Sequence, residues 1–380
     1  LGDDIFIAQT WRELRGRTIG IVTNHSGVLS SGETLIDAAY RNSQITIGAL
    51  FGPEHGIRGS ATAGATVASS TDAQTGLPVY SLYGATRRPT REMLAGIDVL
   101  VFDIQDVGDR AYTYISTMAY VMQAAQDFGK DVWVLDRPNP IGGEVVEGPV
   151  LDPKFSSFIG LYPIAMRHGL TIGELALLFN ERFAIGCNLR VVPMRNYERS
   201  MLWPDTGLDW IPTSPNIPTW QTTLVYPGTG LVSEAGINNG TGDVIPFRPF
   251  FFAGAYEMDG EALAAALNAR ELLGVRFRPA QWEPQSGFWS GKTLTGVELI
   301  ITDPRAFRPV LAAVEILIAV RTIAPRFLSI NSAHLDRDWG TDSLRLGLAA
   351  GLNADAITAQ WADGVRDFER MRQRYFIYAP

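Results

Sequence analysis

The feature that most constrains the fold is an alternation of apolar, β-branched runs with helical patterns in the first half of the chain. The apolar runs lie at residues 18–24, 45–51, 77–82, 97–105 and 131–136. Helical patterns lie between several of them, at 32–42, 90–97 and 114–129. Strands that are apolar throughout are buried on both faces, which is typical of a parallel sheet between two layers of helices.

The domain organisation follows from the rest of the pattern. A helix at 171–183 and a strand at 189–194 add one more unit, so residues 1–195 are predicted to form a Rossmann-like, doubly wound α/β domain. Residues 196–255 are rich in Pro, Gly, Asn and Trp with little periodicity, which predicts loops over a cleft. Further helices and strands complete a smaller α+β C-terminal domain over 196–380, at 259–273, 274–284, 295–303, 307–324 and in two more helices after it.

Charge and composition exclude several classes of partner. The net charge is −8 and no block of Lys and Arg occurs, so neither nucleic acid nor an anionic membrane is an expected partner. No apolar run reaches the roughly 18 residues that a membrane-spanning helix needs. Cys187 is the only cysteine, which rules out an intramolecular disulfide.

Polar clusters follow four of the predicted strands. In parallel sheets, ligands bind outside the carboxyl ends of the strands, so these clusters are expected to converge on one edge. Asp, Asn, Gly and Pro are also ordinary turn residues, and a single cluster would therefore be weak evidence. Four together indicate an enzyme or a binding protein. Their candidate residues are Asn24, His25, Glu54, His55, Asp103, Asp106, Arg110, Tyr112, Asp136, Arg137 and Asn139.

Common cofactor and nucleophile motifs do not explain these clusters. The segment after the first strand is not a GxGxxG fingerprint, and neither a P-loop nor a GxSxG elbow occurs. A metal site is an open alternative, with ligands among His25, His55, Glu54, Asp103 and Asp106. The chain has only four histidines and no HExxH spacing, which argues against it. His168 precedes a predicted capping box and is either a turn residue or a substrate contact.

Acid–base catalysis by a pair of carboxyl groups is the remaining hypothesis for these clusters. Glycosidases use one carboxylic acid to protonate the leaving oxygen and a second carboxylate as base or nucleophile. Glu54 suits the role of the acid, because partial desolvation at the end of an apolar strand would raise its pKa. Asp103 or Asp106 is the candidate partner. Other groups could hold a carboxylate, an amide or a sugar face: Arg110, Arg137, Asn139, Tyr112, Tyr114, Tyr226, Trp210 and Trp220.

Several longer motifs, in order along nearly the whole chain, resemble the NamZ family of exo-β-N-acetylmuramidases. They are TNHSG, LFGPEHGIRG, GLPVYSLYG, VFDIQDVGDRAYTYISTM, LDRPNPIGG, LYPIAMRHGLTIGELALLFN, SPNIP, YPGTGL and the closing FERMRQRYFIY.

The resemblance implies a Rossmann-like catalytic domain, a smaller C-terminal domain and a cleft at their junction. It implies removal of N-acetylmuramic acid from the non-reducing end of peptidoglycan-derived muropeptides or disaccharides, without a cofactor. The glutamate of the PEHG motif, Glu54 here, is the family's proposed catalytic acid. It also implies export from the cytoplasm, although the first residues, LGDDIFIAQTWREL, do not have the pattern of a signal peptide. Motif positions expected to line the pocket include His55, Asp103, Asp106, Arg110, Tyr112, Asp136, Arg137, Asn139 and Asn216.

One loop departs from the family pattern. After YPGTGL the family has EGTN-x-S-x-GRGT, whereas this chain reads VSEAGINNGTGDVIPF. Glu234 is shifted by one position, and Thr241 replaces the arginine. If this loop closes over the sugar, substrate choice would differ. Otherwise it is a re-routed loop in which Glu234 and Asn238 substitute.

Two further functions stay open at this point. A non-catalytic cell-wall sugar binder would keep the cleft and lose the chemistry. A metal-dependent hydrolase or amidase would use His25, His55 and Asp103.

Overall fold

The computed structural model describes residues 1–58, 69–244, 247–330 and 332–380. Its largest element is a seven-stranded sheet with the order β3-β4-β2-β1-β5-β6-β9. The strands are parallel except for β3, which runs antiparallel to β4. Their bounds are β1 (Thr18–Thr23), β2 (Thr46–Gly52), β3 (Ser70–Thr71), β4 (Pro78–Ser81), β5 (Val99–Asp103), β6 (Asp131–Leu135) and β9 (Asn188–Val192).

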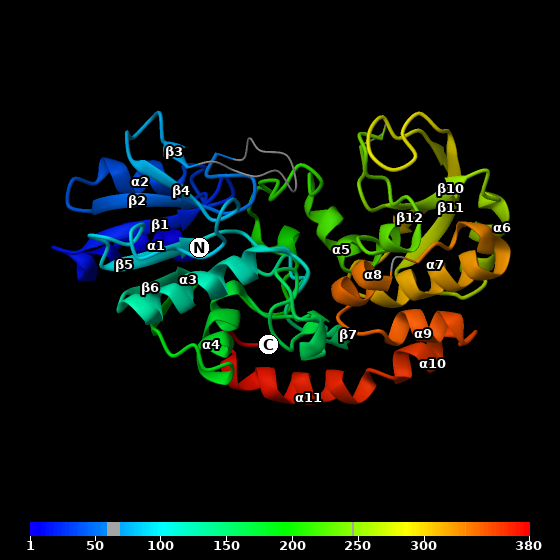
Figure 1. Cartoon of the computed structure of the whole chain (residues 1–380). Coiled ribbons are helices and arrows are strands. Elements are labelled where there is room, and N and C mark those ends of the chain that lie inside the picture. The colour runs from blue at the N-terminus through cyan, green and yellow to red at the C-terminus, as the bar shows by residue number, and fades with distance from the viewer. Residues whose placement is uncertain (59–68, 245–246, 331) are drawn as a thin grey trace.

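Helices cover both faces of this sheet, as the apolar strands predicted (Figure 1). On one face, α1 (Gly2–Ala8) and α2 (Leu35–Arg41) pack in a core with alternate residues of the strands. On the other face, α3 (Tyr114–Phe128) and α4 (Ile172–Arg182) belong to a second core. All five residues of β5 are buried, because helices lie above and below it. The predicted mostly parallel, doubly wound α/β architecture is confirmed.

A second, smaller sheet follows later in the chain. It has three antiparallel strands in the order β10-β12-β11. Its strands are β10 (Phe252–Tyr256), β11 (Val275–Trp282) and β12 (Leu294–Ile301). The helices of this part are α5 (Trp220–Thr229), α6 (Gly260–Asn268), α7 (Pro309–Ile323), α8 (Ser332–Trp339), α9 (Ser343–Ala349) and α10 (Ala354–Ala359).

The two parts are joined at more than one place. Helix α11 (Ala362–Arg372) runs along the lower edge of the molecule in Figure 1, from α10 back toward α4. The Arg372 guanidinium then donates to the carbonyls of Gly143 and Gly169, and the Tyr378 hydroxyl donates to Asp136. The strands β7 (Glu147–Val150) and β8 (Ala165–Arg167) form a separate antiparallel pair. Division of the chain into folding units at residue 195 stays a prediction.

Some local predictions were wrong. Residues 91–96 form turns instead of part of a helix, since the segment between Pro89 and Gly96 is too short to offset the cost of helix nucleation. The predicted loop 196–255 contains α5, which has Pro227 in its interior. Gly228 lets α5 approach α7 closely, because a Cβ there would lie 2.0 Å from the Pro309 carbonyl oxygen. Within the described residues, four α-helices, α8 to α11, follow α7 where two were predicted.

Candidate active site

A cleft of about 280 Å³ lies between the first sheet and the second part of the chain. One wall comes from the turn after β2 and the segment between β5 and α3. The other wall comes from residues 214–217, from α5 and from Phe250. The polar side chains of the lining are those of Glu54, His55, Tyr83, Tyr112, Thr113, Ser214, Asn216 and Tyr226.

Glu54 stands in a tight turn directly after β2. His55 has φ 70° and Gly56 has φ 72°, so two consecutive left-handed residues reverse the chain. The Gly56 amide donates to the Pro53 carbonyl over 3.0 Å and closes the turn. Left-handed backbone is costly for a residue with a side chain and persists where the surroundings enforce it, often at functional sites. The turn thus presents a half-buried Glu54 to the cleft while His55 is buried beside it.

Two hydroxyl groups surround the Glu54 carboxylate. Thr113 Oγ1, at the start of α3, donates a hydrogen bond of 3.0 Å to Glu54 Oε2. The second hydroxyl belongs to Tyr83, in the loop after β4. Burial together with the negative charge of Glu54 raises the pKa of the Tyr83 phenol. Thr113 and Tyr83 were not among the residues predicted for the site. Thr113 could have been found, because it lies between the two tyrosines of the AYTY motif.

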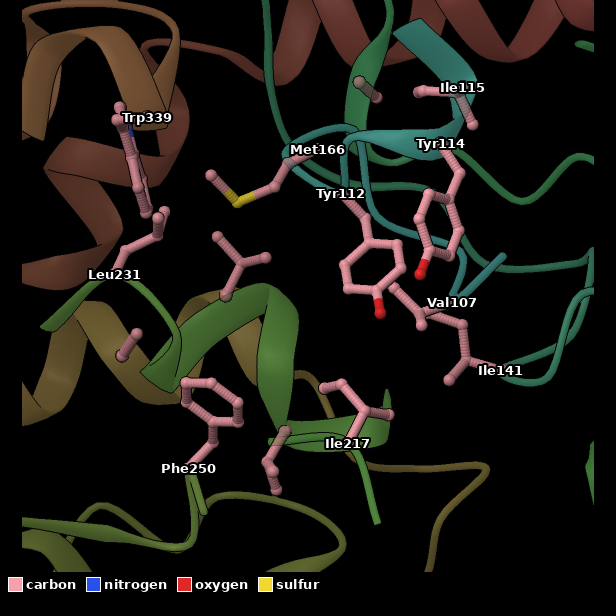
Figure 2. Packing of buried hydrophobic residues seen from close by; sticks show 14 of the residues in the cluster. Val107, Tyr112, Tyr114, Ile115, Ile141, Met166, Ile217, Leu231, Phe250 and Trp339 are labelled. Atoms are coloured by element: carbon pink, nitrogen blue, oxygen red, sulfur yellow. The ribbon is translucent and has the colours of Figure 1, made fainter. Parts of the chain in front are cut away.

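Two tyrosines of the first wall, Tyr112 and Tyr114, hold residues 213–217 of the other wall in place. The rings of Tyr112 and Tyr114 lie side by side in Figure 2. They contact edge to face with centroids 4.9 Å apart, and the Tyr112 and Tyr226 centroids are 5.7 Å apart. The Tyr114 hydroxyl donates to the Thr213 carbonyl over 2.7 Å, and the Tyr112 hydroxyl lies 2.8 Å from Thr213 Oγ1. The segment that contributes Asn216 is therefore fixed directly by two residues that follow β5.

His25 fixes the same segment from the end of β1. Its Nε2 lies 2.6 Å from the Pro212 carbonyl oxygen, so Nε2 carries the proton and donates. Burial lowers the pKa of His25, and the nearby His55 lowers it further. The neutral ring still makes this hydrogen bond. His25 thus acts on the cleft through residues 212–217, and it is absent from the lining itself.

Asp106 is buried and is not among the residues that line the cleft. Its Oδ2 accepts the Gly108 amide at 2.8 Å and lies 3.9 Å from His168 Nε2. Burial raises the pKa of Asp106 to about 7 and lowers the pKa of His168 to about 3. Burial also raises the pKa of Tyr112, and the charges of Asp106 and Glu54 both add to that effect. The carboxyl groups of Glu54 and Asp106 therefore both act on the Tyr112 phenol.

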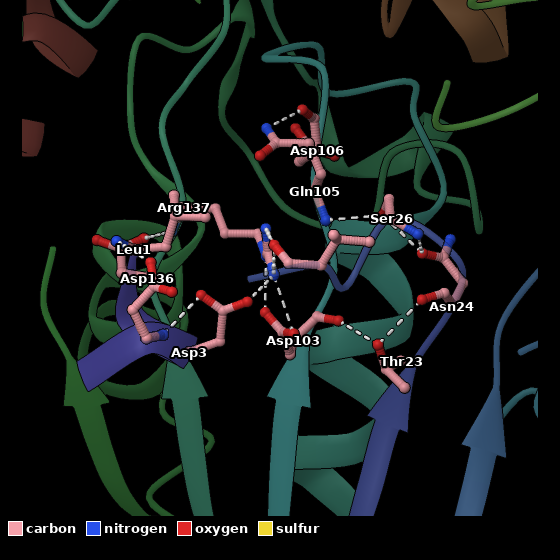
Figure 3. A network of polar contacts seen from close by, with 12 residues as sticks. Leu1, Asp3, Thr23, Asn24, Ser26, Asp103, Gln105, Asp106, Asp136 and Arg137 are labelled. Atoms are coloured by element: carbon pink, nitrogen blue, oxygen red, sulfur yellow. Dashed lines mark hydrogen bonds and ion pairs between the residues drawn. The ribbon is translucent and has the colours of Figure 1, made fainter. Parts of the chain in front are cut away.

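Asp103 and Arg137 form a closed ionic cluster away from the cleft lining (Figure 3). Arg137 Nε donates to Asp103 Oδ1 at 2.6 Å, and Nη2 donates to Asp103 Oδ2 at 3.0 Å and to Asp3 Oδ2 at 2.5 Å. Both aspartates are fully buried. Burial opposes the charge of Arg137, but Asp103 and Asp3 more than offset this and raise its pKa.

Arg110 is also fully buried and lies outside the cleft lining. Its guanidinium donates to four backbone carbonyls, those of Pro149, Ile164, Asp338 and Trp339. The last two belong to α8, so Arg110 links the first part of the chain to the second. Burial lowers its pKa to about 10.

Asp136, Asn139 and Asn24 hold loops and chain ends in place. Asp136 accepts hydrogen bonds from Thr171 Oγ1 and the Gly173 amide, and burial raises its pKa to about 7. Asn139 bridges the Ile141 amide and the Leu170 carbonyl, and Asn24 accepts from the Ser26 amide and hydroxyl. None of the three is in the cleft lining that the described residues form.

The altered loop does not contribute to the cleft lining either. Glu234 lies 3.3 Å from His334 of α8, and Asn238 accepts from Trp282 Nε1 of the second sheet. None of residues 233–243 lines the cleft. Ile245 and Pro246, at the end of the quoted segment, lie outside the described residues. The described residues of this loop therefore give no direct contact through which it would choose the sugar.

The described residues show neither a metal-binding cluster nor a membrane-spanning helix. No group of three or more His, Cys, Asp or Glu side chains in this part of the chain is arranged to hold a metal ion. Across the same residues, no helix has both the length and the hydrophobicity required to cross a membrane.

Comparison with known proteins gives consistent matches over the whole chain. The family model described as exo-β-N-acetylmuramidase NamZ, N-terminal, matches residues 19–221, and its C-terminal counterpart matches residues 224–378. A peptidoglycan β-N-acetylmuramidase NamZ of Bacillus subtilis (strain 168) is 42% identical over 378 residues, which are 99% of this chain and 91% of the relative.

Two crystal structures of DUF1343 family proteins from Bacteroides fragilis are also similar. One has a TM-score of 0.93 at 37% identity, covering 99% of this chain and 98% of that chain. The other has a TM-score of 0.79 at 27% identity, covering 100% of this chain and 98% of that chain.

Proposed function

Because the chain belongs to the NamZ family of exo-β-N-acetylmuramidases, we propose that it removes N-acetylmuramic acid from the non-reducing end of peptidoglycan fragments. The observation that carries the proposal is the position of Glu54. Its carboxyl group lines a cleft large enough for a sugar and is held by Thr113. The Bacillus subtilis relative, whose name states this activity, is similar over nearly the entire chain.

Glu54 is the proposed general acid. The rigid turn after β2 fixes the carboxyl group at the cleft, where it protonates the oxygen of the leaving group. The bond from Thr113 holds Oε2, which orients the carboxyl group relative to the bound sugar. A positioned acid of this kind contributes about 10²–10⁴-fold to the rate.

Asp106 is the proposed second carboxylate. Asp103 is already paired with Arg137, and breaking a buried ion pair is costly. In the part of the chain that the structure describes, the basic side chain within ion-pair distance of Asp106 is His168, and its pKa of about 3 leaves it neutral near pH 7. A pKa of about 7 also suits a group that must accept a proton near neutral pH.

Substrate recognition falls to the groups that line the cleft. His55 and Asn216 offer polar contacts, and Ile217, Tyr226 and Phe250 offer apolar faces for the sugar ring and its lactyl and acetyl methyl groups. Because such sugars come from the cell wall, we also propose that the protein acts outside the cytoplasm, which fractionation of the producing cells would test.

The test is release of para-nitrophenol from its β-N-acetylmuramide and β-N-acetylglucosaminide. We expect the wild type to prefer the muramide. Glu54→Gln should lower turnover by about 10²–10⁴-fold, because the amide cannot supply the proton. The matched control is Glu234→Gln, which changes a glutamate outside the cleft and should leave turnover unchanged. A folded wild type that releases nothing, or equal activity in Glu54→Gln, would overturn the proposal.

A further inference from the structure

Arg87 lies in the loop after β4, the same loop that contributes Tyr83 to the cleft lining. Its guanidinium carbon lies 5.5 Å from the centre of the Tyr83 ring and 4.2 Å from the centre of the Phe158 ring. Phe158 directly precedes Ile159, another residue of the lining. These contacts place the guanidinium at the rim of the cleft, beside the lining rather than within it.

Aromatic rings hold this guanidinium in place. Phe158 is buried and stacks on Tyr120 of α3, with ring centroids 5.8 Å apart. Tyr83 packs against Phe158 with centroids 6.0 Å apart. The attraction between a cation and an aromatic ring uses no hydrogen bond, so the N–H donors of Arg87 stay available. Arg87 is exposed, and a ligand at the rim can therefore reach them.

The charge of Arg87 is not compensated by an acidic group of the described residues. Arg110 and Arg137, which were predicted to hold a substrate carboxylate, are buried and bonded to other groups of the protein. The chain has a net charge of −8, and Glu54 adds a carboxyl group to the cleft lining itself. An anionic substrate therefore needs a local cation, and Arg87 offers one.

A single tyrosine separates Arg87 from the proposed acid. The ring of Tyr83 contacts Arg87, and its side chain is hydrogen-bonded to Glu54. Burial raises the pKa of Tyr83, the charge of Glu54 raises it further, and the charge of Arg87 opposes this rise. A phenol ring and a pyranose ring are of similar width. A sugar beside Tyr83 can therefore meet Glu54 at one end and Arg87 at the other.

We propose that Arg87 binds the lactyl carboxylate of N-acetylmuramic acid and thereby selects the muramide over the glucosaminide. The inference rests on the proposed function, because this carboxylate belongs to the proposed substrate. The lactyl group is attached at O3 of the sugar and the cleaved bond is at C1, so the two groups lie apart, as Arg87 and Glu54 do about Tyr83. A planar guanidinium can donate two parallel hydrogen bonds to a carboxylate. N-acetylglucosamine has no lactyl group to receive them.

The test compares two ligands of nearly the same shape. Methyl 1-thio-β-N-acetylmuramide carries the carboxylate, and its lactyl carboxamide carries a neutral group in the same place. The sulfur linkage of both resists hydrolysis, so binding to the full wild-type chain can be measured by isothermal titration calorimetry. We expect the carboxylate ligand to bind about 5- to 30-fold more tightly, an effect between those of an exposed ion pair and a charge-assisted hydrogen bond.

Variants of Arg87 then separate recognition from support of the rim. Arg87→Gln should weaken binding of the carboxylate ligand to the level of the carboxamide, whose own affinity should stay unchanged. Arg87→Lys keeps the charge without the planar fork and should retain part of the preference. The matched control is Arg88→Gln, since Arg88 is the next residue and already pairs with Asp127. This control should keep the full preference.

Two results would overturn the proposal. Equal binding of the two ligands by the wild type would show that the carboxylate is not recognised. An equal loss of affinity for both ligands in Arg87→Gln would show that Arg87 only supports Tyr83 and Phe158.

Hydrolysis of the para-nitrophenyl muramide is measured in parallel on the same proteins. Hydrolysis by a wild type that binds both ligands equally would defeat the role of Arg87 alone. A preference that depends on Arg87, in a wild type that hydrolyses nothing, would defeat the proposed enzymatic function alone.

Discussion

Two polar clusters at the carboxyl ends of strands in the same sheet have opposite surroundings. After β2, Glu54 is half-buried and lines the cleft, where a hydroxyl group is its donor. After β5 and β6, Asp103 and Arg137 are buried and paired with each other and with Asp3. The same types of residue at equivalent places in the sheet thus form a proposed reaction site in one case and an internal ion cluster in the other.

The difference teaches how to read polar residues at strand ends. A charge without contact to water is tolerated when an opposite charge and hydrogen bonds compensate it, and a charge so engaged is poorly available to a substrate. Position at the edge of the sheet is shared by both clusters. Access and pairing distinguish them, and substitutions in the two clusters should therefore change different properties.

The largest effect is expected from Arg137→Met. This change leaves Asp3 and Asp103 buried without their partner, which should lower the free energy of unfolding by about 3–5 kcal/mol. Urea unfolding measures it. The matched control is Arg370→Met at an exposed ion pair, which should cost less than about 1 kcal/mol. Unchanged stability with lost turnover in Arg137→Met would place Arg137 in the reaction site and break the comparison.

A smaller effect, on turnover, is expected from Thr113→Val. The hydroxyl holds Glu54 Oε2, and a hydrogen bond to a neutral group is worth about 0.5–1.5 kcal/mol, so kcat should fall about 2- to 10-fold. Stability should change little, because this side chain makes no capping bond to α3. Thr113→Ser keeps the hydroxyl and should restore most of the rate. Equal rates in the Val and Ser variants would contradict a positioning role.

The smallest effect concerns pH, at a buried carboxyl that belongs to neither cluster. Burial raises the pKa of Asp109 to about 7, above the value of 3.8 for an exposed aspartate. The folded state therefore holds this proton more tightly than the unfolded state. Its stabilising contribution is complete below about pH 3.8 and is lost as the pH rises through 7.

The expected result is a melting temperature that falls between pH 5 and pH 8. Asp106, Asp136 and Glu147 have the same direction of shift, so they contribute with the same sign. Asp109→Asn should make the slope shallower by removing one such group, whereas Asp209→Asn at an exposed position should not. Thermal unfolding at several pH values measures this, and an unchanged slope in Asp109→Asn would contradict it.

Much of the first sheet could be predicted from the sequence. The runs at 18–24 and 131–136 match β1 and β6 within a residue, because buried parallel strands are apolar throughout. The capping box of Thr171 and Glu174 is present at the start of α4. Helix α5 was missed, because Pro227 is a strong helix breaker and only packing on α7 compensates it.

For the candidate site, the sequence indicated polar residues, and the fold separated those that line the cleft from those that are buried and paired. Glu54, His55, Tyr112 and Asn216 line one cleft. Asp103, Arg110 and Arg137 carry equally strong signals in sequence, yet their partners are Asp3, α8 and each other. A local sequence pattern cannot predict a partner that lies far away along the chain. Asp3 is 134 residues from Arg137, and Trp339 is 229 residues from Arg110.

The sequence by itself therefore determined the fold class, the family and the turn that carries Glu54, since these follow from periodicity and from contiguous motifs. The tertiary structure alone decided which charges are paired, which carboxyl groups lie near the cleft and which arginine stands beside it. The physical reason is that pairing and burial depend on contacts between distant segments, and burial and pairing set whether a charged group is stable, protonated or accessible.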